Sequence, residues 1–232
     1  MNRGPTHPTP HADPGLRSRE VIIPPHGLPG TLRLPPSARA LVLFAHGSGS
    51  SRFSPRNIKV ADGLNAHGIG TLLFDLLTPD EEERRENVFD ITLLAQRLDA
   101  AILWTRQDPE TEALHIGLFG ASTGAGAALV AAATLPGDVE SVVSRGGRPD
   151  LAGDALRKVR AATLLIVGGA DHGVIELNEH ALEQMTCEKA LLIVPGATHL
   201  FPEPGTLEKV VEAASQWFLR TLVAKFGAPT RR

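Results

Sequence analysis

The chain has 232 residues, of which 42% are hydrophobic and 21% are charged, and its formal net charge is −3 at pH 7. These values are ordinary for a globular protein that can bury a sizeable core, and the length suits one large α/β domain or two small ones. The charge provides no basic surface, so we expect neither nucleic acid nor an anionic membrane surface as a partner.

The N-terminal segment is rich in proline and polar residues and has no apolar stretch typical of a signal peptide. Such a composition cannot bury enough surface to offset the cost of ordering, so we predict a disordered tail over 1–17 and a single domain over 18–232. The sequence has no run of about eighteen apolar residues, so it predicts no membrane span. The only cysteine, Cys187, excludes an intramolecular disulfide, and we expect a cytoplasmic protein.

From about residue 18 onward, short apolar runs alternate with longer segments of helical pattern. The apolar runs predict strands at 20–23, 31–34, 40–45, 70–76, 114–119, 139–144, 162–167 and 190–194. The segments between them predict helices near 56–67, 88–106, 123–135, 151–159, 175–185 and 206–225. The middle strands are nearly continuous in Val, Ile, Leu and Phe, as strands covered on both faces must be. This order predicts a doubly wound, mostly parallel α/β sheet of about eight strands.

Two connections refine the predicted topology. The first two strands are joined by a short turn rich in proline and glycine, so we expect an antiparallel hairpin at the edge of the sheet. About seventeen residues separate the strand at 139–144 from the strand at 162–167, which leaves no room for a cap domain. We therefore expect an open, shallow pocket. The acidic run at 80–86 is interpreted as a solvated loop or the start of a helix.

A serine motif follows the strand at 114–119. The residues Gly120, Ala121, Ser122, Thr123 and Gly124 form the pattern G-x-S-x-G and precede an alanine-rich helix. In a strand–turn–helix setting this pattern is typical of a nucleophile elbow, in which the glycines keep the strand and the helix from colliding. The turn places the serine hydroxyl near a helix N-terminus, whose free N–H groups favour developing negative charge. We therefore predict that Ser122 is a nucleophile.

The same segment has a competing interpretation. Gly120, Gly124 and Gly126 also fit the G-x-x-x-G-x-G nucleotide loop of short-chain dehydrogenases. That loop normally opens the chain, and the dehydrogenase chemistry uses a tyrosine. Here the loop follows several strands and the chain contains no tyrosine, so this interpretation is disfavoured, although a purely structural glycine turn stays open.

An acid and then a histidine are expected on later strand ends if Ser122 is a nucleophile. The strand at 162–167 leads into Asp171, and the strand at 190–194 leads into His199. His199 would act as general base and Asp171 would orient it. Alternatively, Asp171 caps the helix predicted near 175–185 and His199 is a loop residue without a role. Asp150 is a substitute acid, and His172 is interpreted as solvated loop.

The strand at 40–45 ends in the loop that begins His46-Gly47-Ser48-Gly49. The backbone N–H groups of Ser48 and Thr123 are candidate donors of an oxyanion hole. His46 is interpreted as a packed structural residue. A dinucleotide loop is excluded because Arg52 stands where G-x-G-x-x-G needs its third glycine. The histidines show no ligand spacing for a metal site.

These segments together resemble the dienelactone-hydrolase-like branch of the α/β-hydrolases over roughly residues 20–222. The resemblance rests on the loop at 46–52, the serine motif at 120–124, and the segments ending in Asp171 and His199. It implies hydrolysis of a small carboxylic ester or lactone without a metal or an organic cofactor, and a homodimer is compatible with it. True dienelactone hydrolases use cysteine as nucleophile, whereas this chain has Ser122. An acyltransferase or a thioesterase with the same residues, and a catalytically silent binding protein, are the alternatives.

Two arginines directly follow the strand at 139–144. Arg145 lies one residue beyond the predicted strand, so its side chain is a candidate for gripping a substrate carboxylate or phosphate at the mouth of the pocket. Arg148 is the second candidate. The alternative is an ion pair of Arg148 with Asp150, or of Arg145 with another aspartate.

Overall fold

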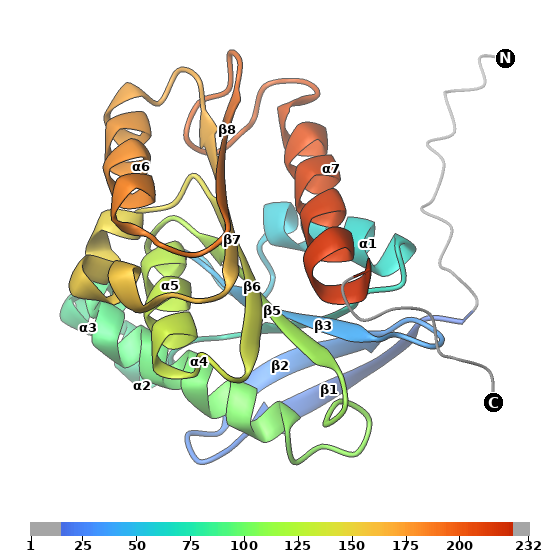
Figure 1. Cartoon of the computed structure of the whole chain (residues 1–232). Helices are drawn as coiled ribbons and strands as arrows, with labels where there is room; N and C mark the ends of the chain where they lie inside the picture. The colour runs from blue at the N-terminus through green and yellow to red at the C-terminus, as the bar shows by residue number, and fades with distance from the viewer. Residues whose placement is uncertain (1–14, 225–232) are drawn as a thin grey trace, which may run out of the picture.

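The central strands are built almost entirely from buried apolar residues, and they lie in the middle of an eight-stranded sheet. The computed structural model describes residues 15–224 (Figure 1). The strands are β1 (Arg17–Ile23), β2 (Leu28–Leu34), β3 (Ala40–Ala45), β4 (Gly70–Phe74), β5 (His115–Ala121), β6 (Val139–Arg145), β7 (Ala162–Gly168) and β8 (Lys189–Val194). Their order in the sheet is β1-β2-β4-β3-β5-β6-β7-β8. All eight predicted strands are present.

Strand direction also agrees with the sequence-based prediction. The pairs β3–β4, β3–β5, β5–β6, β6–β7 and β7–β8 are parallel. The first two strands form an antiparallel hairpin at one edge, and β2 joins it to the parallel part by an antiparallel pairing with β4. The mostly parallel α/β sheet with an antiparallel edge hairpin is thus confirmed. β1 begins at Arg17, and residues 1–14 of the predicted tail lie outside the described residues.

Helices cover both faces of the sheet. They are α1 (Pro55–Ala66), α2 (Pro79–Glu82), α3 (Arg85–Phe89), α4 (Ile91–Thr105), α5 (Thr123–Thr134), α6 (His172–Gln184) and α7 (Thr206–Phe218), with a 3₁₀ segment η1 (Pro149–Lys158) and a π-helical turn η2 (Leu219–Val223). Helices α1 and α7 lie on one face, and α4, α5 and α6 lie on the other (Figure 1). Within the described chain, no helix is long and apolar enough to span a bilayer.

Two helix predictions need correction. The single helix expected near 88–106 is divided at Asp90, whose carboxylate accepts the N–H of Leu93 at 3.0 Å and so begins a new helix, α4. The helix expected near 175–185 starts earlier, so His172 is its first residue and not part of a loop. The acidic run after Thr78 does start a helix, because Thr78 and Glu81 form a capping box at α2.

Each face of the sheet has its own apolar core. On the α1/α7 face, the rings of Phe44 and Phe119 pack with their centroids 5.0 Å apart and their planes tilted by 35°, and Phe218 is fully buried. On the opposite face, the alanine-rich helix α5 packs against η1 and α4. The connection between β6 and β7 holds only η1 and no cap domain, as the sequence predicted.

The turn between β5 and α5 depends on the absence of side chains at two glycines. A Cβ atom on Gly120 would lie 2.4 Å from the Cα of Ala125 in α5. A Cβ on Gly124 would lie 2.3 Å from the carbonyl oxygen of Ala45 at the end of β3. These distances are far below van der Waals contact, and the obstructing atoms are backbone. The two glycines therefore let three elements meet at one point.

We expect Gly120→Ala to destabilise the protein by about 1–3 kcal/mol or more, because α5 would have to move away from β5. The matched control is Gly137→Ala, where an added Cβ meets nothing within 4 Å and where the effect should stay within about 0.5 kcal/mol. Urea unfolding followed by circular dichroism measures both. Equal stability of the two variants would contradict the crowding that the backbone geometry indicates.

Candidate active site

Ser122 sits in a strained turn at the carboxyl end of β5. Its backbone has φ +51° and ψ −121°, a region that residues with a side chain rarely occupy. The Ser122 N–H donates to the carbonyl of Arg145 at 3.3 Å, and its own carbonyl accepts N–H groups from Ala125 and Arg148, both at 3.1 Å. These bonds fix the strained conformation, which costs roughly 1–3 kcal/mol in comparable cases. Such strain is typical of a functional position.

Asp171 and His199 lie side by side although 28 positions separate them. Asp171 follows β7 and His199 follows β8, and these strands are parallel neighbours. The Nδ1 atom of His199 is 2.7 Å from Oδ2 of Asp171. Asp171 occupies the N-cap position of α6, but its side chain makes no capping hydrogen bond. The carboxylate therefore contacts the histidine and not the helix that it precedes.

Gly146 lies between the loop that carries His199 and the turn that carries Ser122. This glycine directly follows Arg145, which pairs with Ala121 across β5 and β6. A Cβ on Gly146 would lie 2.8 Å from the carbonyl oxygen of His199 and 3.7 Å from its Cε1 atom. Within residues 15–224, no hydrogen bond joins the Ser122 hydroxyl to the His199 ring; such bonds are commonly long before substrate binds.

The loop after β3 approaches the serine turn from the other side. A Cβ on Gly47 would lie 3.0 Å from the Cβ of Ser122. The backbone N–H of Ser48 donates to the Thr123 hydroxyl at 3.0 Å. The two candidate oxyanion residues are thus adjacent, but the Ser48 N–H is already engaged. The N–H of Thr123, the first residue of α5, has no partner inside its helix.

An anchor that the sequence analysis missed holds this loop in place. Arg52 forms an ion pair with Asp75, and its backbone N–H donates to the same carboxylate at 2.7 Å. The guanidinium also lies 4.2 Å from the ring centroid of Phe53. Asp75 directly follows β4, so its place at the carboxyl end of a strand was a signal that could have identified it.

His46 is buried, with 7% of its surface exposed. Its Nε2 accepts the N–H of Leu76 at 3.1 Å, and its Nδ1 lies 3.1 Å from the carbonyl oxygen of Gly47, which it can reach only as a donor. Burial lowers the pKa of His46 below its usual 6.5. The residue is a neutral structural group that joins the ends of β3 and β4, as the sequence analysis expected.

The two arginines after β6 have different surroundings. Arg148 forms two hydrogen bonds with Asp150, at 2.8 and 2.7 Å, so Asp150 is engaged with Arg148 and does not contact His199. Arg145 is only 5% exposed, and its side chain bonds to Asn57 of α1 at 3.4 Å. The expectation that Arg145 stands at an exposed pocket mouth is therefore wrong. It is the last residue of β6 and shares the α1/α7 face with Val143.

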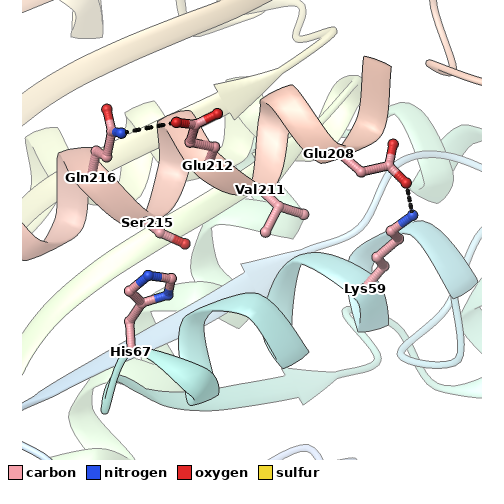
Figure 2. A pocket seen from close by; sticks show the side chains of 7 residues that line it. All are labelled: Lys59, His67, Glu208, Val211, Glu212, Ser215 and Gln216. Atoms are coloured by element: carbon pink, nitrogen blue, oxygen red, sulfur yellow. Dashed lines mark hydrogen bonds and ion pairs between the residues drawn. The ribbon is translucent and has the colours of Figure 1, made fainter. Parts of the chain in front are cut away.

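A separate groove of about 400 Å³ lies between α1 and α7 (Figure 2). It is lined by Lys59, His67, Glu208, Val211, Glu212, Ser215 and Gln216. An ion pair between Lys59 and Glu208 joins the two helices at one end. None of the sequence-predicted site residues lines this groove.

Comparison with known proteins finds a matching family and several solved structures of similar fold. Residues 64–227 match the model of the dienelactone hydrolase family. A dienelactone hydrolase from Anabaena variabilis is 55% identical, with a TM-score of 0.85 and coverage of 89% of this chain and 98% of that one. Two less similar structures share the fold: Est1E from Butyrivibrio proteoclasticus (17% identity, TM-score 0.73, coverage 88% and 98%) and XC6422 from Xanthomonas campestris, described as an a/b serine hydrolase without lid (22%, 0.68, 93% and 99%).

Proteins from two strains of Mycobacterium tuberculosis carry the name "Putative phosphoribosyl transferase". Each is 57% identical to this chain over 210 residues, which is 90% of this chain and 47% of theirs. The chain therefore spans about half the length of these curated relatives.

The burial of neutral His46 predicts a pH dependence of stability. Well above pH 6.5 both the folded and the unfolded state hold His46 neutral. Below it the unfolded chain takes up a proton that the folded chain resists, so this contribution is lost as the pH falls, by up to about 1.4 kcal/mol per pH unit. We expect His46→Gln to show a flatter decline between pH 6.5 and 5 than the wild type in urea unfolding. Parallel profiles would contradict this role of His46.

Proposed function

The chain belongs to the dienelactone hydrolase family and has the α/β-hydrolase fold, and from this premise we propose that it is a serine hydrolase that cleaves a carboxylic ester or lactone. Ser122 is the nucleophile, His199 the general base and Asp171 the acid that orients it. The observation that carries the proposal is the 2.7 Å contact between His199 and Asp171 on the strand ends beside the strained Ser122.

The proposed reaction has two steps. The Ser122 oxygen attacks the substrate carbonyl while His199 Nε2 accepts the hydroxyl proton, and Asp171 stabilises the resulting imidazolium. The tetrahedral intermediate collapses to an acyl-serine, and the leaving alkoxide takes the proton from His199. Water, deprotonated by the same imidazole, then releases the acid and restores Ser122. These steps use protein side chains and water alone.

The N–H of Thr123 is the first proposed donor to the developing oxyanion, because it starts α5 and lies next to the nucleophile. The N–H of Ser48 is the second. Since it donates to the Thr123 hydroxyl in the resting protein, it must be shared between that hydroxyl and the oxyanion, or be released by rotation of the Thr123 side chain. The Arg52–Asp75 anchor would keep the loop in position during this change.

The surroundings favour a substrate with an apolar part. Three large apolar side chains are exposed on segments that follow the carboxyl ends of strands: Phe53 (61%) and Leu200 (46%) on loops, and Leu151 (36%) in η1. No cap domain covers this edge in the described chain. An open, partly apolar rim can accept an ester or lactone without a lid movement.

The transferase name of the mycobacterial relatives does not change this proposal. Those proteins are about twice as long as the part they share with this chain, so the name can describe their other half. The Ser122, His199 and Asp171 set fits acyl chemistry, including transfer to an acceptor alcohol or a thiol ester substrate, which remain the nearest alternatives. A catalytically silent binding protein would have no need of this geometry.

A fluorophosphonate probe should label the protein once, at Ser122, because the activated hydroxyl attacks phosphorus as it attacks a carbonyl. Ser122→Ala should lose the label and lower ester turnover by several orders of magnitude while keeping the fold. Intact-mass and peptide mass spectrometry measure the adduct. A missing adduct, or one on another serine, would overturn the nucleophile assignment.

Asp171→Asn should lower kcat roughly 10⁴-fold, because the amide favours the wrong tautomer of His199. Asp150→Asn is the matched control, since Asp150 contacts Arg148 and not the histidine, and it should leave kcat nearly unchanged. Steady-state kinetics on a short-chain 4-nitrophenyl ester measures both. A larger loss for Asp150→Asn would assign the acid to the preceding strand end.

A further inference from the structure

Among residues 15–224, Arg145 is a buried cation without an acidic partner. Its side chain is 5% exposed, its hydrogen bond to Asn57 is long at 3.4 Å, and its Nε has no partner among the described residues. A buried charge is costly unless it is paired. Arg97, with 6% exposure, shows the usual solution in the same protein: it forms an ion pair with Glu81. Arg145 has no such counter-charge within the described part of the chain.

The charge that does act on Arg145 is a second cation, Arg56, in the first turn of α1. Burial and the positive charge of Arg56 lower the pKa of Arg145 to about 10, so Arg145 remains protonated at neutral pH. Arg56 is partly exposed, and its Nε also has no partner among the described residues. Arg145 bonds to Asn57, the residue that follows Arg56 in α1, so Arg145 contacts the same first turn of the helix that holds Arg56. Neither of them forms an ion pair with a carboxylate among residues 15–224.

This pair adjoins the proposed catalytic site. Arg145 ends β6, pairs with Ala121, and accepts the N–H of Ser122 with its carbonyl. Gly146, the next residue, lies against His199. Arg56 follows the loop that carries Ser48, at the N-terminal end of α1, where the helix dipole favours an anion.

We infer that Arg145 and Arg56 form a subsite for a phosphate group on the ester substrate, beside Ser122. The inference rests on the proposed function and names its substrate class. Two unpaired guanidinium groups match the charge of about −2 that a phosphate monoester carries near neutral pH, whereas a carboxylate would neutralise only one of them. Arg56 is exposed enough to meet the ligand first, and Arg145 supplies the desolvated contact.

Titration calorimetry with inorganic phosphate at constant ionic strength tests the subsite without any catalytic step. We expect saturable binding to the wild type, weakened about ten- to a hundredfold in Arg56→Gln and in Arg145→Gln. Arg148→Gln is the matched control, because Arg148 already pairs with Asp150, and it should bind phosphate as the wild type does. Arg145→Lys, which keeps the charge, should bind better than Arg145→Gln.

Acetate in the same titration separates the two kinds of anion. Acetate bound as tightly as phosphate would overturn the assignment to phosphate. Absence of phosphate binding, or unchanged binding in Arg56→Gln, would overturn the subsite. Because Arg56→Gln leaves the buried Arg145 in place, this result stands even if Arg145→Gln fails to fold.

Kinetics on matched esters extends the test to turnover. We expect kcat/KM for 1-acetylglycerol 3-phosphate to exceed that for 1-acetylglycerol about tenfold. Arg56→Gln should lower kcat/KM for the phosphorylated ester much more than for the neutral ester, so that the difference between them disappears. Methyl hydrogen succinate against dimethyl succinate should show a smaller preference. Equal kcat/KM for the phosphorylated and neutral esters would overturn the inference. Loss of the subsite with intact probe labelling of Ser122 would leave the proposed hydrolase standing, so the two failures are distinguishable.

Discussion

The close approach of β3, β5 and α5 at Gly120 and Gly124 is the constraint on which the rest of the site depends. Backbone atoms of α5 and of β3 occupy the space that a side chain would need at either glycine. This contact forces the chain to turn within a single residue, and that residue, Ser122, takes a positive φ. A wider turn would relieve the strain but would move the serine away from the end of the strand.

The parallel sheet brings the other proposed catalytic residues to the same edge as Ser122. Loops that leave β3, β7 and β8 all begin at one edge of the sheet, so residues far apart in the sequence meet there. Asp171 shows how this placement decides the role of a side chain. It stands where a helix cap is expected, yet the neighbouring strand brings His199 within 2.7 Å, and the carboxylate contacts the ring instead.

The sequence was informative wherever one segment determines its own structure. Short apolar runs predicted all eight strands, and the glycine spacing predicted the turn at Ser122. The break at Asp90 was missed because helical pattern continues on both sides of it, and the Asp90 side chain caps a new helix by accepting the N–H of Leu93. Arg145 was misplaced because β6 extends one residue further than its apolar run. As a strand residue, Arg145 directs its side chain to the α1/α7 face and not into a loop.

Contacts between separate elements could not be predicted from any single segment. Examples are the pairing of Arg52 with Asp75 and the approach of Arg145 to the first turn of α1, both of which depend on how the elements pack.

The costly features of the molecule are gathered at one edge of the sheet. The strained Ser122 and the buried Arg145, which has no acidic partner among residues 15–224, both lie at the carboxyl ends of the strands. Strain of roughly 1–3 kcal/mol at one residue is tolerable only because the surrounding structure over-determines it. Here two apolar cores, one on each face, hold β5 and β6 rigidly on both sides. A substrate that carries negative charge to this edge would offset part of the cost of burying Arg145, so binding and stability would be coupled at the same residues.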